Sequence, residues 1–295
     1  MNIAIIGNSY FGEILTKQLN EFDKENRYKF YNTSEKVLDK IKFALHIVNI
    51  DVVYSISASI SGGGALNLAL KFDKKIIQHF IGSDVLSARE DFKNDKVNNT
   101  LIQKSKYLCE VDWIQEELKE ININSKVQPI MVYENIIEPK KFKEFEVLTY
   151  IGKGKERFYG IDDFIQLAKD FPKLKFKIAG IDMYPNLPTN IKCLGWIDMQ
   201  KEMQNSTIFI RNTKHDGLGF TVLEALSLGR VIFYNYDFPH VNYFQNYKQL
   251  KDKFEIKYQE FQDGRLDIDY EAIEFIKENF NRDRVLYTLI KKMLK

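Results

Sequence analysis

The sequence contains few cysteines, no long apolar run and almost no net charge. Its 295 residues include two cysteines, Cys109 and Cys193, which stand far apart in apolar surroundings. Two isolated thiols argue against a disulfide framework and lack the spacing of a metal site. No stretch approaches the roughly 20 apolar residues that span a bilayer, and the first residues do not have the pattern of a signal peptide. We therefore expect a cytoplasmic protein with no transmembrane segment and no metal.

The charge balance excludes another class of protein. Lysine and arginine number 43 against 41 acidic residues, a net charge of +2. That excess is too small for a nucleic-acid-binding protein, although a local basic face would still permit peripheral contact with a membrane. Hydrophobic residues make up 44% and charged residues 28%, which is typical of a globular protein with a sizeable core.

Short apolar segments alternate with amphipathic ones along the whole chain. Residues 2–7 predict a strand that ends in glycine and precedes a helix, and the same cycle restarts at residues 146–152. This alternation predicts parallel sheets covered by helices on both faces. The restart favours two doubly wound domains, residues 1–143 and 144–295, divided within the polar stretch 133–146. A (β/α)8 barrel would need eight regular units, which the irregular middle does not supply.

Ligands of such sheets bind beyond the carboxyl ends of the strands, so the turns there are the candidate sites. The turn at residues 7–12, GNSYFG, lacks the third glycine of a dinucleotide fingerprint and the Lys-Ser/Thr pair of a P-loop. It is either a tight turn or a place where the backbone at Gly12 touches a ligand. The hypothesis of an NAD-dependent oxidoreductase depends on this turn alone.

Two further turns of the first half carry glycine or small polar residues. SGGGA, residues 61–65, permits close backbone approach to a ligand but serves helix–sheet packing equally well. IGSDV, residues 81–85, places Ser83 and Asp84 at the end of a strand. Asp84 either caps a local turn or lines the cleft together with Ser83.

The turn GKGKERFYG, residues 152–160, is rich in positive charge. It contains Lys153, Lys155 and Arg157 directly after the first strand of the second half. Such a run is often only a solvated loop. Beyond a strand end and opposite another helix start, it suits the oxygens of a diphosphate, and we favour that interpretation.

The segment KHDGLGFTVLEALSLGRVIF, residues 214–233, combines glycines, a helix start and two acids. The helix is expected to begin near residues 219–221, where free N–H groups attract phosphate. Glu224 is either a partly exposed helical glutamate or an acceptor of hydrogen bonds from ribose hydroxyls, and Asp216 is placed to grip the hydroxyls of a sugar. A glycosidase also uses two acids, but it needs no phosphate site. The pattern therefore favours a nucleotide-sugar.

This segment resembles the E-x7-E signature of retaining GT-B glycosyltransferases of family 4 (glycosyl transferases group 1), usually written E-G-F-G-x-x-x-L-E-A-x-A-x-G. Residues 147–180 are similar to the family's first C-domain strand, phosphate turn and helix, and residues 190–198 to the turn that meets the nucleotide base. The resemblance implies two Rossmann-like domains facing a cleft. The donor would bind the C-terminal half and the acceptor the N-terminal half, and the last helix would pack back on the N-domain.

Residue by residue, the resemblance implies a role for each matched position. Glu224 would hold the ribose and Asp216 the donor sugar, while Lys153 takes the slot of a diphosphate-binding arginine. Lys155 or Arg157 would replace a second basic residue, where Tyr159 stands nearest. The expected catalytic residues are Asp216, Lys153 and Arg157. The expected donor-binding residues are Gly12, Lys155, Gly195, Trp196, Gly217, Leu218, Gly219, Phe220, Thr221 and Glu224. Ser83 and Asp84 are expected on the acceptor side.

The resemblance also implies a reaction. A metal-independent, hexosyltransferase-like enzyme would move a sugar from a nucleotide-diphosphate sugar, with no other cofactor, to a glycan, a lipid-linked acceptor or a small molecule. The departing phosphate would take the acceptor's proton, while Lys153, Arg157 and the helix start stabilise the developing charge. Three features depart from the family: Asp216 replaces a glutamate, Ile81 and Gly82 replace a His-Gly pair, and the first half is short. A sugar-nucleotide epimerase of the same fold and a non-catalytic nucleotide-sugar-binding paralogue remain alternatives.

Overall fold

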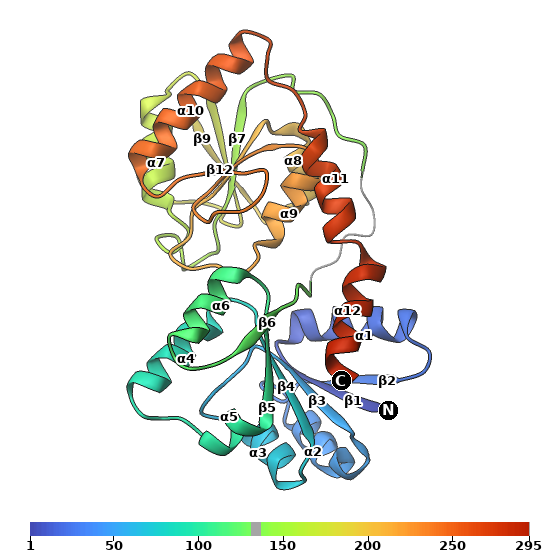
Figure 1. Ribbon diagram of the computed structural model, residues 1–295. Helices are drawn as coiled ribbons and strands as arrows, with labels where there is room; N and C mark the ends of the chain where they lie inside the picture. The colour runs from blue at the N-terminus through green and yellow to red at the C-terminus, as the bar shows by residue number, and fades with distance from the viewer. Residues whose placement is uncertain (131–136, 295) are drawn as a thin grey trace. The chain divides into compact units, whose positions relative to one another are not determined.

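The computed structural model of the chain describes residues 1–130 and 137–294 (Figure 1). The chain divides into two compact units, residues 1–132 with 282–295 and residues 133–281. The first residues of the expected domain boundary, 133–136, lie outside the described residues. Within the described ranges, no helix is both long and apolar enough to span a membrane.

The first unit is built on a six-stranded parallel sheet with the order β2-β1-β3-β4-β5-β6. Its strands are β1 (Asn2–Gly7), β2 (Arg27–Tyr31), β3 (Val52–Ile56), β4 (Lys75–Phe80), β5 (Ser105–Cys109) and β6 (Ser125–Val127). Its helices are α1 (Ser9–Phe22), α2 (Val37–His46), α3 (Gly64–Lys71), α4 (Asp84–Lys93), α5 (Asn99–Lys104), α6 (Asp112–Lys119) and α12 (Arg282–Leu294), with a 3-10 turn η1 at Ile47–Asn49.

Apolar side chains cover both faces of this sheet, as expected for parallel strands. On one face Leu15 of α1 and Leu289 of α12 pack with Ile5 of β1. On the other face Phe43 of α2 and Ala69 of α3 complete a second cluster. The end of the chain therefore forms part of the core of the first unit.

The second unit is a parallel sheet with the order β12-β11-β10-β7-β8-β9. Its strands are β7 (Glu146–Tyr150), β8 (Lys175–Ala179), β9 (Ile191–Gly195), β10 (Ile208–Arg211), β11 (Val231–Tyr234) and β12 (Asn242–Tyr243). Its helices are α7 (Ile161–Asp170), α8 (Met199–Asn205), α9 (Phe220–Ser227), α10 (Tyr247–Gln262) and α11 (Tyr270–Asn279). The two doubly wound parallel sheets predicted from the sequence are confirmed.

Strand β7 lies between β8 and β10 in this order. The chain continues from β7 to β8 on one side, whereas β10 pairs with β7 on the other side. The strand order therefore reverses between β7 and β10. Loops that leave the carboxyl ends of strands at such a switch point diverge and open a crevice where ligands bind. The loops at this point are residues 151–160 and 212–219.

Candidate functional site

The two loops at the switch point are held together by backbone and side-chain hydrogen bonds. The N–H of Lys214 donates to the carbonyl of Phe158 at 2.9 Å. The Asn212 side chain donates to Asp163 of α7 at 2.8 Å. Gly160 has φ +66°, and a Cβ there would lie 2.7 Å from the Asn212 amide nitrogen. A larger residue at position 160 would be strained and would push these loops apart.

A buried ion pair fixes the base of the second loop. Arg211, at the end of β10, is 8% exposed. Its Nε and Nη2 donate to the two carboxylate oxygens of Asp216 at 2.7 and 2.9 Å. Burial lowers the pKa of Arg211, but the Asp216 charge more than reverses this and holds it above its usual value. The guanidinium also lies over the Tyr159 ring, 5.1 Å from its centroid, so the pair joins both loops.

This arrangement adds to what the sequence predicts for Asp216. A carboxylate offers about four acceptor positions. Arg211 donates to two of them, and the Tyr234 hydroxyl donates to Oδ2 at 3.1 Å. Asp216 is thus a fixed part of the loop, and its expected contact with a donor sugar stays a prediction. Arg211 is not among the residues predicted from the sequence, although a charge at the end of the apolar strand IFIR signals a need for a partner.

Helix α9 begins at Phe220 after the N-cap residue Gly219, which confirms the helix start predicted at residues 219–221. Gly217, Leu218 and Gly219 are buried, and Phe220 and Thr221 are half-buried. A Cβ on Gly219 would lie 3.2 Å from the Asp216 carboxylate, so even alanine would crowd the ion pair. Among the described residues, the buried Thr221 hydroxyl has no hydrogen-bond partner.

Glu224 lies one turn into α9 and differs sharply from Asp216. Its side chain is half-buried, and burial, with the nearby charge of Asp198 second, raises its pKa to about 7. Across the described part of the chain, no hydrogen bond to its carboxylate offsets that cost. A carboxylate without donors in a desolvated position is typical of a functional site.

Asp198 belongs to the turn between β9 and α8, where the sequence predicts contact with a base. It caps α8 by accepting from the N–H of Lys201 at 3.1 Å, and α8 and α9 lie side by side (Figure 1). Two residues earlier, Trp196 is 86% exposed. Gly195 has φ +68°, and a Cβ there would lie 2.5 Å from the Asp182 carboxylate. The turn that contains the exposed Trp196 thus also contains Asp198, whose charge acts on Glu224.

The basic turn after β7 is open to solvent. Lys153, Lys155 and Arg157 are all exposed. The Arg157 Nε lies 3.9 Å from Asp162, but both side chains are at least 70% exposed, and such pairs contribute little. In the described ranges Lys153 and Lys155 form no ion pair, so these cations are available to an anion.

The residues predicted in the first unit have structural contacts of their own. Gly12 is buried in α1, where a Cβ would lie 2.3 Å from the Phe30 ring of β2. The Asp84 carboxylate accepts the backbone N–H groups of Ala58, Ile81 and Gly82 at 2.9 to 3.1 Å. It therefore caps the local turn, the alternative left open for it, and burial raises its pKa to about 6.

Three further features of the first unit differ in their surroundings. Ser83, exposed, directly precedes α4. His79, two residues before the position of the expected His-Gly pair, is fully buried with its Nδ1 2.5 Å from the Tyr54 hydroxyl. Burial lowers its pKa to about 3, so it is a neutral core residue. In the SGGGA turn, a Cβ on Gly63 or Gly64 would meet no atom within 4 Å, so close packing does not explain these two glycines.

Comparison with known proteins extends over the whole chain. No family model and no curated protein matches the sequence. Solved structures do match. HepE from Anabaena, solved in complex with UDP, has a TM-score of 0.76 at 11% identity and 99% coverage of both chains. A glycosyltransferase from Rickettsia africae has a TM-score of 0.71 at 15% identity, covering 100% of this chain and 98% of that one. Sucrose-phosphate synthase from Thermosynechococcus elongatus has a TM-score of 0.72 at 10% identity, covering 99% and 98%.

The chain has the GT-B fold. Identities this low establish the architecture alone, and the GT-B fold class expected from the sequence is confirmed by them. The switch point of the second sheet brings together a helix start, solvent-facing cations and one carboxylate to which no residue in the described ranges donates.

Proposed function

We propose that the protein is a retaining, metal-independent glycosyltransferase that uses a nucleotide-diphosphate sugar. The observation that carries the proposal is the Glu224 carboxylate, whose pKa is raised to about 7 by burial and to which no described residue donates a hydrogen bond. The vicinal hydroxyls of a ribose supply two such donors in a geometry that a carboxylate can accept. The UDP complex of HepE, which has the same fold, supports a nucleotide as the ligand.

The diphosphate has a matching environment at the start of α9. The first N–H groups of a helix attract phosphate through hydrogen bonding and the aligned peptide dipoles. In the proposal, Lys153 with Lys155 or Arg157 contacts the same phosphates, and the backbone of residues 217–221 contacts the β-phosphate and the sugar. Gly195 and Trp196 are close in sequence to Asp198, whose charge contributes to the raised pKa of Glu224. The nucleotide base would therefore stack near these two residues.

The chemistry proposed for this site is a same-face substitution. The bond between the anomeric carbon and the β-phosphate oxygen breaks, and the acceptor oxygen bonds to that carbon on the same face. The acceptor's proton passes to the departing phosphate oxygen. The helix start and Lys153 stabilise the negative charge on that phosphate. Asp216 holds the loop through Arg211 and, in the proposal, contacts the hydroxyls of the donor sugar.

The acceptor is proposed to bind at the first unit. Ser83 and Asp84 stand at the carboxyl end of β4, the edge of a parallel sheet where ligands bind. A glycan or a lipid-linked sugar is the proposed acceptor, and the cytoplasm the proposed location. No cofactor beyond the donor is part of the proposal.

One comparison of two ligands tests the central assignment. Calorimetry with UDP and 2′-deoxy-UDP should show a preference for UDP of about tenfold in the wild type, the typical worth of a hydrogen bond to a charged group. Glu224→Gln should bind UDP more weakly and lose most of that preference. The exposed Glu255→Gln on α10 is the matched control. The same comparison is made with GDP and 2′-deoxy-GDP, because the proposal does not assign the base of the donor nucleotide.

An unchanged preference in Glu224→Gln would refute the ribose assignment. Product analysis then separates the reaction classes. A transferase should leave the donor nearly intact without an acceptor, whereas an epimerase of the same fold would convert it to a second nucleotide-sugar. Conversion of the donor alone would overturn the proposed transfer reaction.

A further inference from the structure

The outward side of helix α2 in the first unit is apolar. A set of large apolar side chains on α2 and on the 3-10 turn η1 that follows it is between 51% and 72% exposed. These side chains, which we call the α2 face, are Val37, Leu38, Ile41, Leu45 and Val48. Their spacing follows the helical repeat, so they lie along one side of the helix. Contiguous exposed apolar patches mark sites of contact with proteins or membranes.

The packing of the first unit does not involve these side chains. Helix α2 buries its other side, where Phe43, together with Ile47 of η1, joins the core cluster that contains Val53. Surface helices normally carry polar residues on the side opposite the core. The α2 face instead exposes apolar residues that α2 does not need for its own packing.

Lysines flank the α2 face on both sides. Successive residues of a helix are about 100° apart around its axis, so Lys40 and Lys42 stand on either side of Ile41. Both lysines are exposed, as is Lys36, which directly precedes the helix. At the far end lies Lys74, whose ammonium donates to a carbonyl of η1 at 3.1 Å. Positive charge thus borders the apolar side chains along the length of α2.

Two acidic side chains of the same stretch are held by Asn32, a buried residue directly after β2. The carboxylate of Asp39 accepts from the Asn32 backbone N–H at 3.1 Å, and that of Glu35 accepts from the Asn32 side chain at 2.9 Å. Lys42 lies 3.9 Å from Asp39, a long and partly exposed pair that contributes little. Among the described residues, the other two flanking lysines of the stretch form no ion pair. The charge that α2 offers to a partner is therefore positive.

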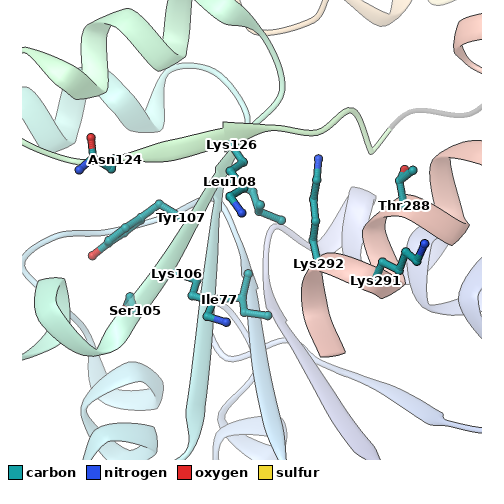
Figure 2. A pocket seen from close by; sticks show the side chains of 10 residues that line it. All are labelled: Ile77, Ser105, Lys106, Tyr107, Leu108, Asn124, Lys126, Thr288, Lys291 and Lys292. Atoms are coloured by element: carbon teal, nitrogen blue, oxygen red, sulfur yellow. The ribbon is translucent and has the colours of Figure 1, made fainter. Parts of the chain in front are cut away.

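The opposite face of the same sheet carries lysines over a buried apolar floor. Figure 2 shows a cavity there, lined by Lys126 of β6 and Lys291 of α12. Its apolar floor, Ile77 and Leu108, is buried in the core cluster that includes α12. Ile77 points away from Ile76, its neighbour on β4, which belongs to the cluster beneath α2. This face therefore supplies matched cations for comparison with the lysines of α2.

We propose that the α2 face binds an anionic membrane surface. The apolar side chains would enter the boundary between headgroups and acyl chains, while the flanking lysines contact the lipid phosphates. The charge decides between this occupant and a second copy of the chain. In a symmetric dimer the same face meets itself, so its lysines would oppose one another, whereas an anionic headgroup layer attracts them. The α2 face belongs to the first unit and the proposed donor site to the second, so the two are tested separately.

The test is co-sedimentation of the whole chain with vesicles of phosphatidylglycerol mixed with phosphatidylcholine, and with vesicles of phosphatidylcholine alone. The wild type should partition at least about tenfold more strongly onto the anionic vesicles. Lys36→Gln with Lys40→Gln should weaken that partitioning about 30-fold, which is about fivefold for each lysine. Lys126→Gln with Lys291→Gln removes the same charge from the opposite face and should leave the partitioning nearly unchanged.

A second pair of variants tests the apolar contribution. Ile41→Gln with Leu45→Gln should weaken partitioning about tenfold or more, because it removes apolar surface from the lipid contact. Its control, Ile14→Gln with Ile256→Gln, changes exposed isoleucines of α1 and α10 and should have no effect. Brominated acyl chains in the anionic vesicles should quench the fluorescence of Ile41→Trp more than that of the wild type, and that of Ile256→Trp no more than the wild type.

Equal partitioning of the α2 variants and their controls would overturn the proposal, as would equal partitioning of the wild type onto neutral vesicles. A concentration-dependent dimer in sedimentation velocity that Ile41→Gln with Leu45→Gln abolishes would assign the face to a second copy instead. Far-UV circular dichroism of each variant should match the wild type, which separates lost contact from lost folding. UDP affinity, measured on the same samples, should not change, so failure here is distinguishable from failure of the proposed function.

Discussion

Replacing Glu224 with glutamine should have opposite effects on stability and on nucleotide binding. In the free protein the Glu224 carboxylate is desolvated, and its pKa is raised from 4.5 to about 7. Glutamine has nearly the same shape and no charge to desolvate. We therefore expect Glu224→Gln to stabilise the second unit above pH 7 while it weakens binding of UDP.

The magnitude follows from the pKa. A group whose folded pKa exceeds its unfolded value contributes stability below the unfolded pKa and loses that contribution as pH rises through the folded one. The ionised carboxylate therefore opposes folding above pH 7. The difference between 4.5 and about 7 corresponds to about 3 kcal/mol at most. Glutamine should recover up to that amount at pH 8, and the advantage should disappear near pH 4.5.

Urea unfolding of the wild type and of Glu224→Gln at pH 8 and pH 4.5 measures this difference. Since two units need not unfold together, hydrogen exchange in α9 identifies the transition that belongs to residues 133–281. Calorimetry with UDP at pH 8 supplies the second half of the result. Equal stability at pH 8 would refute the desolvation argument. Higher stability with unchanged UDP affinity would refute the binding role, and Glu255→Gln should alter neither quantity.

Three other substitutions test the remaining contacts. Asp216→Asn should lower the free energy of unfolding by about 3–5 kcal/mol in urea titrations, because it leaves the buried Arg211 without its counter-charge. Lys153→Ala should weaken UDP binding about tenfold in calorimetry and leave uridine binding unchanged, since the lysine is proposed to contact the diphosphate. Gly12→Ala should destabilise the first unit by about 1–3 kcal/mol, because its Cβ would lie 2.3 Å from the Phe30 ring.

Each of these substitutions has a result that would contradict its reasoning. A stable Asp216→Asn protein would mean that the ion pair is dispensable to the loop. Equal losses of UDP and uridine binding in Lys153→Ala would indicate a general disturbance of the site. Lost UDP affinity at unchanged stability in Gly12→Ala would favour the ligand contact over packing.

The parts of the structure that could be predicted from the sequence depend on local patterns. Alternating apolar and helical segments indicated two parallel sheets, and GLGF before an apolar run indicated the start of α9 at Phe220. Glu224 stood out because a charge inside an apolar helix is costly. These signals lie within a few residues of one another, so no knowledge of tertiary contacts was needed.

The missed features depend on contacts between distant segments. The close approach of the Phe30 ring to Gly12 is one such contact, and the ligand contact expected at Gly12 stays a prediction. Arg211 and Asp216 are close in sequence, but their pairing depends on β10 ending beside a loop that turns back over it. Asp84 similarly caps a turn that includes Ala58, which lies after β3. Sequence spacing does not reveal which carboxylate will receive hydrogen bonds from the folded protein.

The two acids of the E-x7-E-like segment show why that distinction matters for function. Asp216 and Glu224 stand eight residues apart, and both are at least partly buried. Asp216 has Arg211 and Tyr234 as donors, so the fold itself offsets the cost of its charge. Among the residues that the structure describes, Glu224 has no such donor, and burial raises its pKa to about 7. A fold that retains an uncompensated carboxylate loses stability unless a ligand supplies the donors. The compensated acid therefore holds the loop, and the uncompensated one is the acid for which we propose ribose as the ligand.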